Sequence, residues 1–310
     1  MLDLQIAAIL KQAQEDNAPD FSDLTPEGAR IALEQIQEQL QAPAADVETR
    51  DVNIEVPNGI IPLRIYSPRT DGAKSVLLYF HGGGFVLGGI DTFEGITSTL
   101  AEKTDCIVVA VGYRLAPEHK FPTASEDSYA ALKWVAENAS RINGDPGKIA
   151  IIGESAGGNL AAVCALLARD NDGPAIKLQV LIYPTTALKP DGFSSYEQYG
   201  EGYLLTRRSM EYFRKHYYDQ IEVIDDYRAA PLLAENLSNL PPAMMIVAKY
   251  DPLRDEGLAY AQRLAEAGNH VVVTEYLGMT HAFFTLTKVV DAAVQAVDQV
   301  ASAVRQAMAK

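Results

Sequence analysis

The sequence has few cysteines and no long apolar run. Cys106 and Cys164 are the 2 cysteines among 310 residues, and neither has the spacing of a metal ligand. We interpret both as small buried apolar residues, as suits a reducing compartment. No apolar run is long enough to span a membrane, and the N-terminus lacks the basic start and apolar core of a signal peptide. We therefore expect a soluble cytoplasmic protein.

Positive charge is also scarce. Lys and Arg number 26 against 41 Asp and Glu, which gives a formal net charge of −15. An acidic surface disfavours nucleic acids and anionic membranes as partners. The 48% hydrophobic content can fill a large core, and the length suits one large α/β domain with an insertion.

The first 45 residues differ in character from the rest. They are rich in Ala, Gln and Glu, with apolar residues at helical spacing, and they predict two helices. Thr25 and Pro26 form a good helix start, and Pro43 follows the end of the second helix. We interpret residues 1–45 as part of a cap; the alternative is an ordinary helical arm.

Strands then dominate, and later they alternate with helices. Asn58-Gly59 between two apolar-alternating runs predicts a hairpin over 49–66. Helical stretches are expected near 92–103, 125–139, 158–169, 255–267 and 289–308. Alternating strands and helices predict a mostly parallel sheet with an antiparallel edge. The short apolar runs expected as its later strands are Ser75–Phe80, Cys106–Val111, Ile149–Ile152, Leu178–Tyr183, Ala243–Ala248 and Val271–Tyr276.

One connection between strands is too long for a simple crossover. More than fifty residues separate Pro184 from Pro241, whereas about a dozen are enough for a crossover helix. Its first part contains an aromatic-rich, helix-like run. We interpret residues 187–224 as a second cap segment that divides a catalytic core of residues 46–186 and 225–310.

The stretch Gly153–Gly157 has the form G-x-S-x-G, with Ser155 at its centre. It lies between a predicted strand and a predicted helix, which is the context of a nucleophile elbow. A serine hydroxyl is a weak nucleophile at neutral pH and needs a base, which in turn needs an orienting acid. In this arrangement the partners follow in the order Ser, Asp or Glu, His.

Three histidines follow the serine, and we assign His281 as the base. His216 lies in the expected cap helix, and His270 begins a strand. Only His281 lies in a loop at the carboxyl end of a strand, where open α/β sheets build their sites.

The acid should also follow a strand. Asp251 is the first carboxylate after the run Ala243–Lys249, and we assign it as the acid. Asp255 and Glu256 are its rivals, although carboxylates at these positions also suit the start of the next helix.

Negative charge develops on the substrate oxygen during acyl transfer, and backbone N–H groups must meet it. Ala156, directly after the nucleophile, supplies one. The others should come from the glycine-rich loop His81–Phe85, in which we interpret His81 as an anchor rather than a second base. No Gly-Lys-Ser/Thr follows this loop, which argues against a phosphate-binding loop.

Five stretches together resemble the microbial hormone-sensitive-lipase family (family IV) of carboxylesterases, and the resemblance covers essentially the whole chain. It implies an α/β-hydrolase fold with an eight-stranded sheet, a two-part helical cap and ester hydrolysis without a cofactor. It also implies a triad of Ser155, Asp251 and His281, with Gly83, Gly84 and Ala156 as the oxyanion hole. The stretches are His81–Phe85, Tyr113–His119, Gly153–Ala161, Asp251–Gly257 and His281–Phe283.

One residue departs from the family pattern, because Glu154 stands where Asp is frequent. The resemblance implies small ester substrates with acyl chains of about four to eight carbons, and a broad profile, since apolar pockets separate chain lengths weakly. The same triad also serves amidases and lactonases. Non-catalytic ligand receptors on this fold lack the histidine that is present here as His281. A monomer and a homodimer both remain open.

Overall fold

The computed structural model describes residues 1–187, 189–220 and 225–309. Residues 188 and 221–224, which fall in the expected cap segment, lie outside this part. Within it, eight strands form one sheet in the order β1-β2-β4-β3-β5-β6-β7-β8. The β1–β2 and β2–β4 pairs are antiparallel and the others are parallel, which confirms the expected sheet. The strands are β1 (Glu48–Val56), β2 (Gly59–Ser67), β3 (Lys74–Phe80), β4 (Ile107–Val111), β5 (Gly144–Glu154), β6 (Leu178–Ile182), β7 (Ala243–Tyr250) and β8 (Val271–Thr280).

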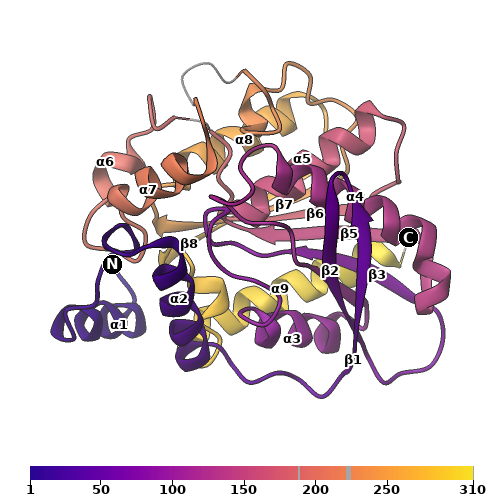
Figure 1. Ribbon diagram of the computed structural model, residues 1–310, viewed down its shortest axis with the longest axis horizontal. Coiled ribbons are helices and arrows are strands. Elements are labelled where there is room, and N and C mark those ends of the chain that lie inside the picture. The colour runs from indigo at the N-terminus through magenta and orange to yellow at the C-terminus, as the bar shows by residue number, and fades with distance from the viewer. Residues whose placement is uncertain (188, 221–224, 310) are drawn as a thin grey trace.

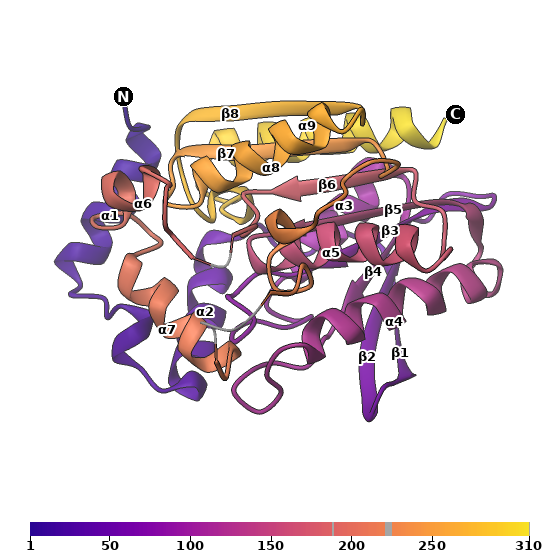
Figure 2. The same ribbon diagram turned by 90° about the horizontal axis from the view of Figure 1, so that it is seen from above.

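Helices cover both faces of the sheet (Figure 1, Figure 2). The helices α3 and α9 pack on one face, and α4, α5 and α8 pack on the other. Every residue of β4 and β6 is therefore buried, which explains their continuous apolar runs. The helices are α1 (Leu4–Glu15), α2 (Pro26–Leu40), α3 (Glu94–Thr104), α4 (Thr123–Asn138), α5 (Ala156–Asp170), α6 (Ser195–Tyr199), α7 (Arg207–Tyr217), α8 (Arg254–Glu266) and α9 (Asp291–Met308). Short 3₁₀ helices lie at Phe21–Asp23, Ala139–Ile142, Pro231–Leu233 and Phe283–Thr285.

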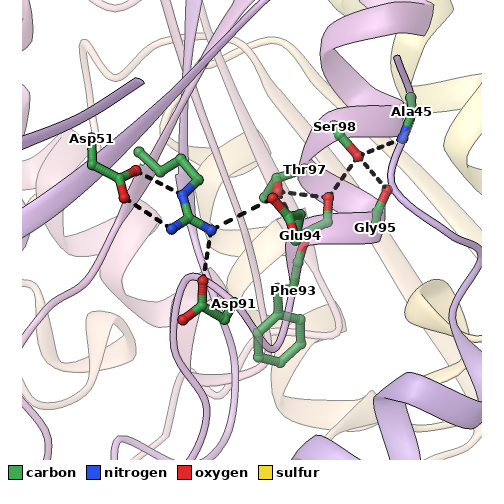
Figure 3. A network of polar contacts seen from close by, with 9 residues as sticks. Ala45, Asp51, Asp91, Phe93, Glu94, Gly95, Thr97 and Ser98 are labelled. Carbon is green, nitrogen blue, oxygen red and sulfur yellow. Dashed lines mark hydrogen bonds and ion pairs between the residues drawn. The ribbon is translucent and has the colours of Figure 1, made fainter. Parts of the chain in front are cut away.

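The hairpin of β1 and β2 turns at Asn58, whose φ of 60° suits an Asn-Gly turn. Arg64 on β2 joins this hairpin to the start of α3. Its guanidinium pairs with Asp51 at 2.7 Å, Asp91 at 2.6 Å and Glu94 at 3.5 Å, and the three carboxylates converge on it from different elements (Figure 3). These ion pairs thus connect the antiparallel strands β1 and β2 to helix α3.

The N-terminal segment, with helices α1 and α2, and the segment before β7, with helices α6 and α7, lie side by side at one end of the molecule (Figure 1, Figure 2). Asp20, just before the first 3₁₀ helix, accepts hydrogen bonds from the hydroxyls of Thr206 and Ser209 at the start of α7. Arg208 pairs with Asp23 beside them. Two segments that are distant in sequence therefore form one polar junction. Among the described residues, no helix is both long and apolar enough to cross a membrane.

Candidate active site

The strand β5 ends in a sharp turn at Ser155, and α5 begins at the next residue. Ser155 has a φ of 57°, a conformation that costs energy for a residue with a side chain. Glycine is required on both sides of the turn. A Cβ atom on Gly153 would lie 2.1 Å from the carbonyl oxygen of Gly157, and one on Gly157 would lie 1.9 Å from that of Phe80. The turn therefore has the geometry expected of a nucleophile elbow.

The structure brings the three side chains selected from the sequence into one chain of contacts. Nε2 of His281 lies 2.9 Å from Oγ of Ser155, and Nδ1 lies 2.7 Å from Oδ2 of Asp251. The other carboxylate oxygen of Asp251 accepts the N–H of Leu253 at 2.8 Å. Asp251 is fully buried and His281 is 6% exposed. Because Asp251 follows β7 and His281 follows β8, both stand at the carboxyl edge of the sheet beside Ser155.

The two rival carboxylates are engaged elsewhere. Asp255 pairs with Arg254 at 2.6 Å and accepts the N–H of Ser195 at 2.9 Å. Glu256 is fully buried and accepts the N–H of Thr186 at 2.6 Å. Burial raises the pKa of Glu256. Both residues lie on α8, as their helix-start positions indicated, and they fasten the segment before β7 to the core.

His81 anchors the glycine-rich loop from within. Its Nδ1 lies 2.7 Å from the carbonyl oxygen of Gly82, and its ring stacks with the rings of Phe93 and Tyr113. The Tyr113 hydroxyl donates to the carbonyl oxygen of His81 at 2.8 Å. Burial lowers the pKa of His81 to about 4, so the ring is neutral near pH 7. These contacts agree with an anchoring role.

The loop that follows has two glycines with positive φ, Gly83 at 105° and Gly84 at 61°. The carbonyl oxygen of Gly83 accepts the N–H of Leu87 at 2.8 Å, which closes the loop on itself. Neither glycine N–H donates a main-chain hydrogen bond within the described part of the chain. Gly83, Gly84 and Ala156 all line the same cavity as Ser155. Their N–H groups are thus available to a ligand in that cavity.

The cavity above Ser155 is mainly apolar. Its lining residues come from segments that are far apart in the sequence, from Phe21 to Thr285. The sequence predicted that residues 1–45 and the aromatic-rich run that forms α7 belong to a cap, and residues of both segments line the cavity. The sequence did not indicate the contribution of Leu253, because no local pattern distinguishes a lining residue from an ordinary packing residue. The larger apolar lining residues are Phe21, Leu33, Phe85, Leu87, Phe93, Leu204, Leu205, Met210, Phe213 and Leu253. Among the described residues, no cluster of His, Cys, Asp or Glu has the arrangement of a metal site.

Comparisons with known proteins agree with this geometry. A family model described as alpha/beta hydrolase fold matches residues 77–285. The chain is 41% identical over 284 residues to the carboxylic ester hydrolase LipN of Mycobacterium tuberculosis, covering 89% of this chain and 75% of LipN. It is 44% identical over 253 residues to the esterase LipI of the same organism, covering 80% and 79%.

A solved structure is also similar over nearly its full length. The hyperthermophilic esterase from Pyrobaculum calidifontis superposes with a TM-score of 0.91 at 38% sequence identity, covering 98% of each chain. On these grounds the chain belongs to the alpha/beta-hydrolase family, in its hormone-sensitive-lipase-like branch (family IV), as its motifs indicated.

Proposed function

We propose that this protein is a carboxylesterase that hydrolyses short- to medium-chain carboxylic esters through an acyl-enzyme. One observation carries the proposal: the unbroken contact from Ser155 through His281 to Asp251 opens into a mainly apolar cavity. The names of the relatives, a carboxylic ester hydrolase and two esterases, support the reaction class. An amidase or a lactonase with the same triad is the alternative.

The reaction follows from the three contacts. Oγ of Ser155 attacks the ester carbonyl carbon while Nε2 of His281 takes its proton. Asp251 accepts the N–H on the other ring nitrogen, which fixes the tautomer and stabilises the imidazolium. The tetrahedral intermediate collapses, and the alcohol leaves with the proton from His281. Water then attacks the acyl-serine with His281 again as the base, which releases the acid and restores Ser155.

The negative oxygen of the intermediate would lie at the backbone N–H groups of Gly83, Gly84 and Ala156. These donors are fixed before substrate arrives, so they stabilise charge without reorganising. Ala156 is the first residue of α5, where the positive end of the helix dipole adds to the effect. Each donor is worth about 3 kcal/mol of the barrier.

We further propose that residues 1–45 and 187–224 form a two-part cap over a core of residues 46–186 and 225–310. The polar junction at Asp20 supports it, as do cavity-lining residues from both segments, such as Phe21 and Phe213. An acyl chain would lie against this apolar wall. Such a wall separates neighbouring chain lengths by only about 1–3 kcal/mol per methylene, so we expect a broad optimum.

An acyl-length series of p-nitrophenyl esters, from acetate to palmitate, tests the proposal on wild type and Ser155→Ala together. We expect wild type to prefer the short and medium esters, and Ser155→Ala to lose turnover by at least about 10⁴-fold. Ser302→Ala, on the outer helix α9, is the matched control and should keep wild-type rates. Retained turnover in Ser155→Ala would refute the mechanism. Faster hydrolysis of matched amides or lactones, or of emulsified long-chain triglyceride, would refute the substrate class.

A further inference from the structure

The residue directly before the nucleophile reaches across to the oxyanion loop. Glu154 is the last residue of β5, and its side chain is 4% exposed. Its Oε1 accepts the N–H of Gly82, the residue immediately before Gly83 and Gly84. A Cβ atom on Gly82 would lie 2.2 Å from Oε2 of Glu154, so the carboxyl group fills the space that this glycine leaves open. One carboxyl group therefore contacts the loop and adjoins the nucleophile in sequence.

Within the described residues, the groups that shift the pKa of this carboxyl group include a phenol and no cation. Tyr79 on β3, Tyr113 after β4 and Tyr183 after β6 each have a pKa raised well above the usual value by burial, and the Glu154 charge adds to the shift. The hydroxyls of Tyr79 and Tyr183 have no hydrogen-bond partner within the described residues. The phenol oxygens near Glu154 can thus accept a hydrogen bond from its neutral carboxyl group. Arg214 also lines the cavity, and it is not among the groups that shift the pKa of Glu154.

Two histidines also lie near this carboxyl group or its phenol neighbours. His81 contacts Gly82 through its ring nitrogen and is neutral near pH 7, as described above. The ring of His281 lies beside that of Tyr183, with ring centroids 4.6 Å apart, and the charge of Asp251 raises the pKa of that phenol. Between about pH 7 and pH 9, the burial-shifted tyrosines and His81 therefore keep their protonation states.

We propose that Glu154 is a positioning residue of the esterase reaction, whose carboxyl group holds Gly82 and thereby fixes the oxyanion loop relative to Ser155. The inference rests on the proposed function, because it assigns a role to the same site. Glu154 acts through the main chain of the two glycines that follow Gly82.

The carboxyl group performs this role as a neutral acid. Burial raises the pKa of Glu154 to about 8, although the hydrogen bond from Gly82 and the nearby Tyr79 hydroxyl oppose the shift. A neutral carboxyl group can accept the Gly82 N–H with one oxygen and donate its O–H to a phenol oxygen with the other. A carboxylate here would place a negative charge near the position where the oxyanion forms, which would raise the barrier. Ionisation of Glu154 should therefore slow the acylation step.

The pH dependence of kcat separates this role from simple packing. Wild type should lose about tenfold in kcat between pH 7 and pH 9, as the neutral form of a group with a pKa of about 8 disappears. Glu154→Gln keeps an acceptor and a donor but cannot ionise, so its kcat should stay level over this range. Glu154→Ala removes the contact, and its kcat at pH 7 should fall about 100-fold with little change in KM, as expected for a displaced oxyanion loop.

Glu256→Gln is the matched control, because Glu256 is an equally buried glutamate that contacts Thr186 instead of the oxyanion loop. It should keep the wild-type decline above pH 8. Wild-type ester turnover that Ser155→Ala abolishes, measured in the same series, establishes the proposed function independently. A decline in Glu154→Gln equal to that of wild type would then overturn the neutral-acid role alone. Since Gln is nearly the same size as Glu, this variant decides the question even if Glu154→Ala does not fold.

Discussion

Gly84→Ala is the sharpest test of the oxyanion loop, because an added methyl group has no room there. The new Cβ atom would lie 2.3 Å from Cγ of Phe213, and the next two neighbours are also atoms of this ring. That separation is more than 1 Å closer than ordinary van der Waals contact. Either the loop that carries the proposed donor or the aromatic ring must move.

We expect the loop to move. The Phe213 ring packs against Phe21 and Tyr212 and belongs to helix α7, which restricts its displacement. Displacing the Gly84 N–H would remove one oxyanion donor, at a cost of about 3 kcal/mol or 10²–10³-fold in kcat. The φ of 61° at Gly84 adds roughly 1–2 kcal/mol of conformational strain for alanine, and this strain falls on stability.

Steady-state kinetics on p-nitrophenyl butyrate measure the effect. We expect kcat to fall about 100-fold in Gly84→Ala with KM nearly unchanged. The double variant Gly84→Ala/Phe213→Ala should have a kcat at least tenfold higher than Gly84→Ala alone. Each 1.4 kcal/mol of barrier removed by relieving the overlap raises the rate about tenfold. Gly89→Ala lies four residues beyond Phe85, and its added Cβ would have no atom within 4 Å, so this variant should keep the wild-type kcat. An unchanged kcat with a raised KM in Gly84→Ala would mean that the ring yields, and the reasoning would be refuted.

Three further predictions concern stability and reactivity. Arg114→Met should lower the unfolding free energy in urea by about 3–5 kcal/mol, because it leaves the fully buried Asp127 carboxylate without its bidentate partner. Asp20→Asn should destabilise the protein more at pH 7 than at pH 3. Burial opposes ionisation of Asp20, but hydrogen bonds from hydroxyl groups outweigh it and lower its pKa, so its contribution is lost as the pH falls. Cys106 and Cys164 should react with a thiol reagent only after unfolding, since burial raises the pKa of both thiols.

Each of these predictions has a control or a contrary outcome. For Arg114→Met the control is Arg69→Met, which removes an exposed ion pair with Asp46; the two side chains are 57% and 87% exposed. Arg69→Met should lower the unfolding free energy by less than about 1 kcal/mol. An equally small loss for Arg114→Met would contradict the buried-pair argument. An effect of Asp20→Asn that is the same at both pH values would show that its charge does not stabilise the junction. Rapid labelling of native protein would contradict the burial of the two thiols.

The architecture could be predicted from the sequence because its signals are local. Short apolar runs between turn residues predicted the later strands, and β4 extends over Ile107–Val111 where Cys106–Val111 was expected. The order of a parallel sheet then places loops that follow strands at one edge. For that reason Ser155, Asp251 and His281 could be selected together before any distance was known.

Contacts between distant segments could not be predicted in the same way. Glu154 was recognisable as an unusual neighbour of the nucleophile, but nothing in the sequence pairs it with Gly82, 72 residues earlier. Likewise, helical spacing in the first 45 residues indicates a helix and does not show that Phe21 reaches the cavity. Both contacts depend on which strand or helix lies beside which, and local patterns do not contain that information.

Strand register explains why these distant residues meet. In the parallel pair of β3 and β5, Phe80 lies opposite Gly153. Both chains leave the sheet within the next two residues, so the glycine-rich loop and the nucleophile turn emerge at the same level from neighbouring strands. A slip of one residue would turn Glu154 to the other face of the sheet and away from Gly82. The apolar cores on both faces of the sheet oppose such a slip, since it would exchange their buried side chains. The alignment of the proposed oxyanion donors with Ser155 is thus a consequence of core packing. The contact between Glu154 and Gly82 holds the two chains together just beyond the last paired residues of β3 and β5.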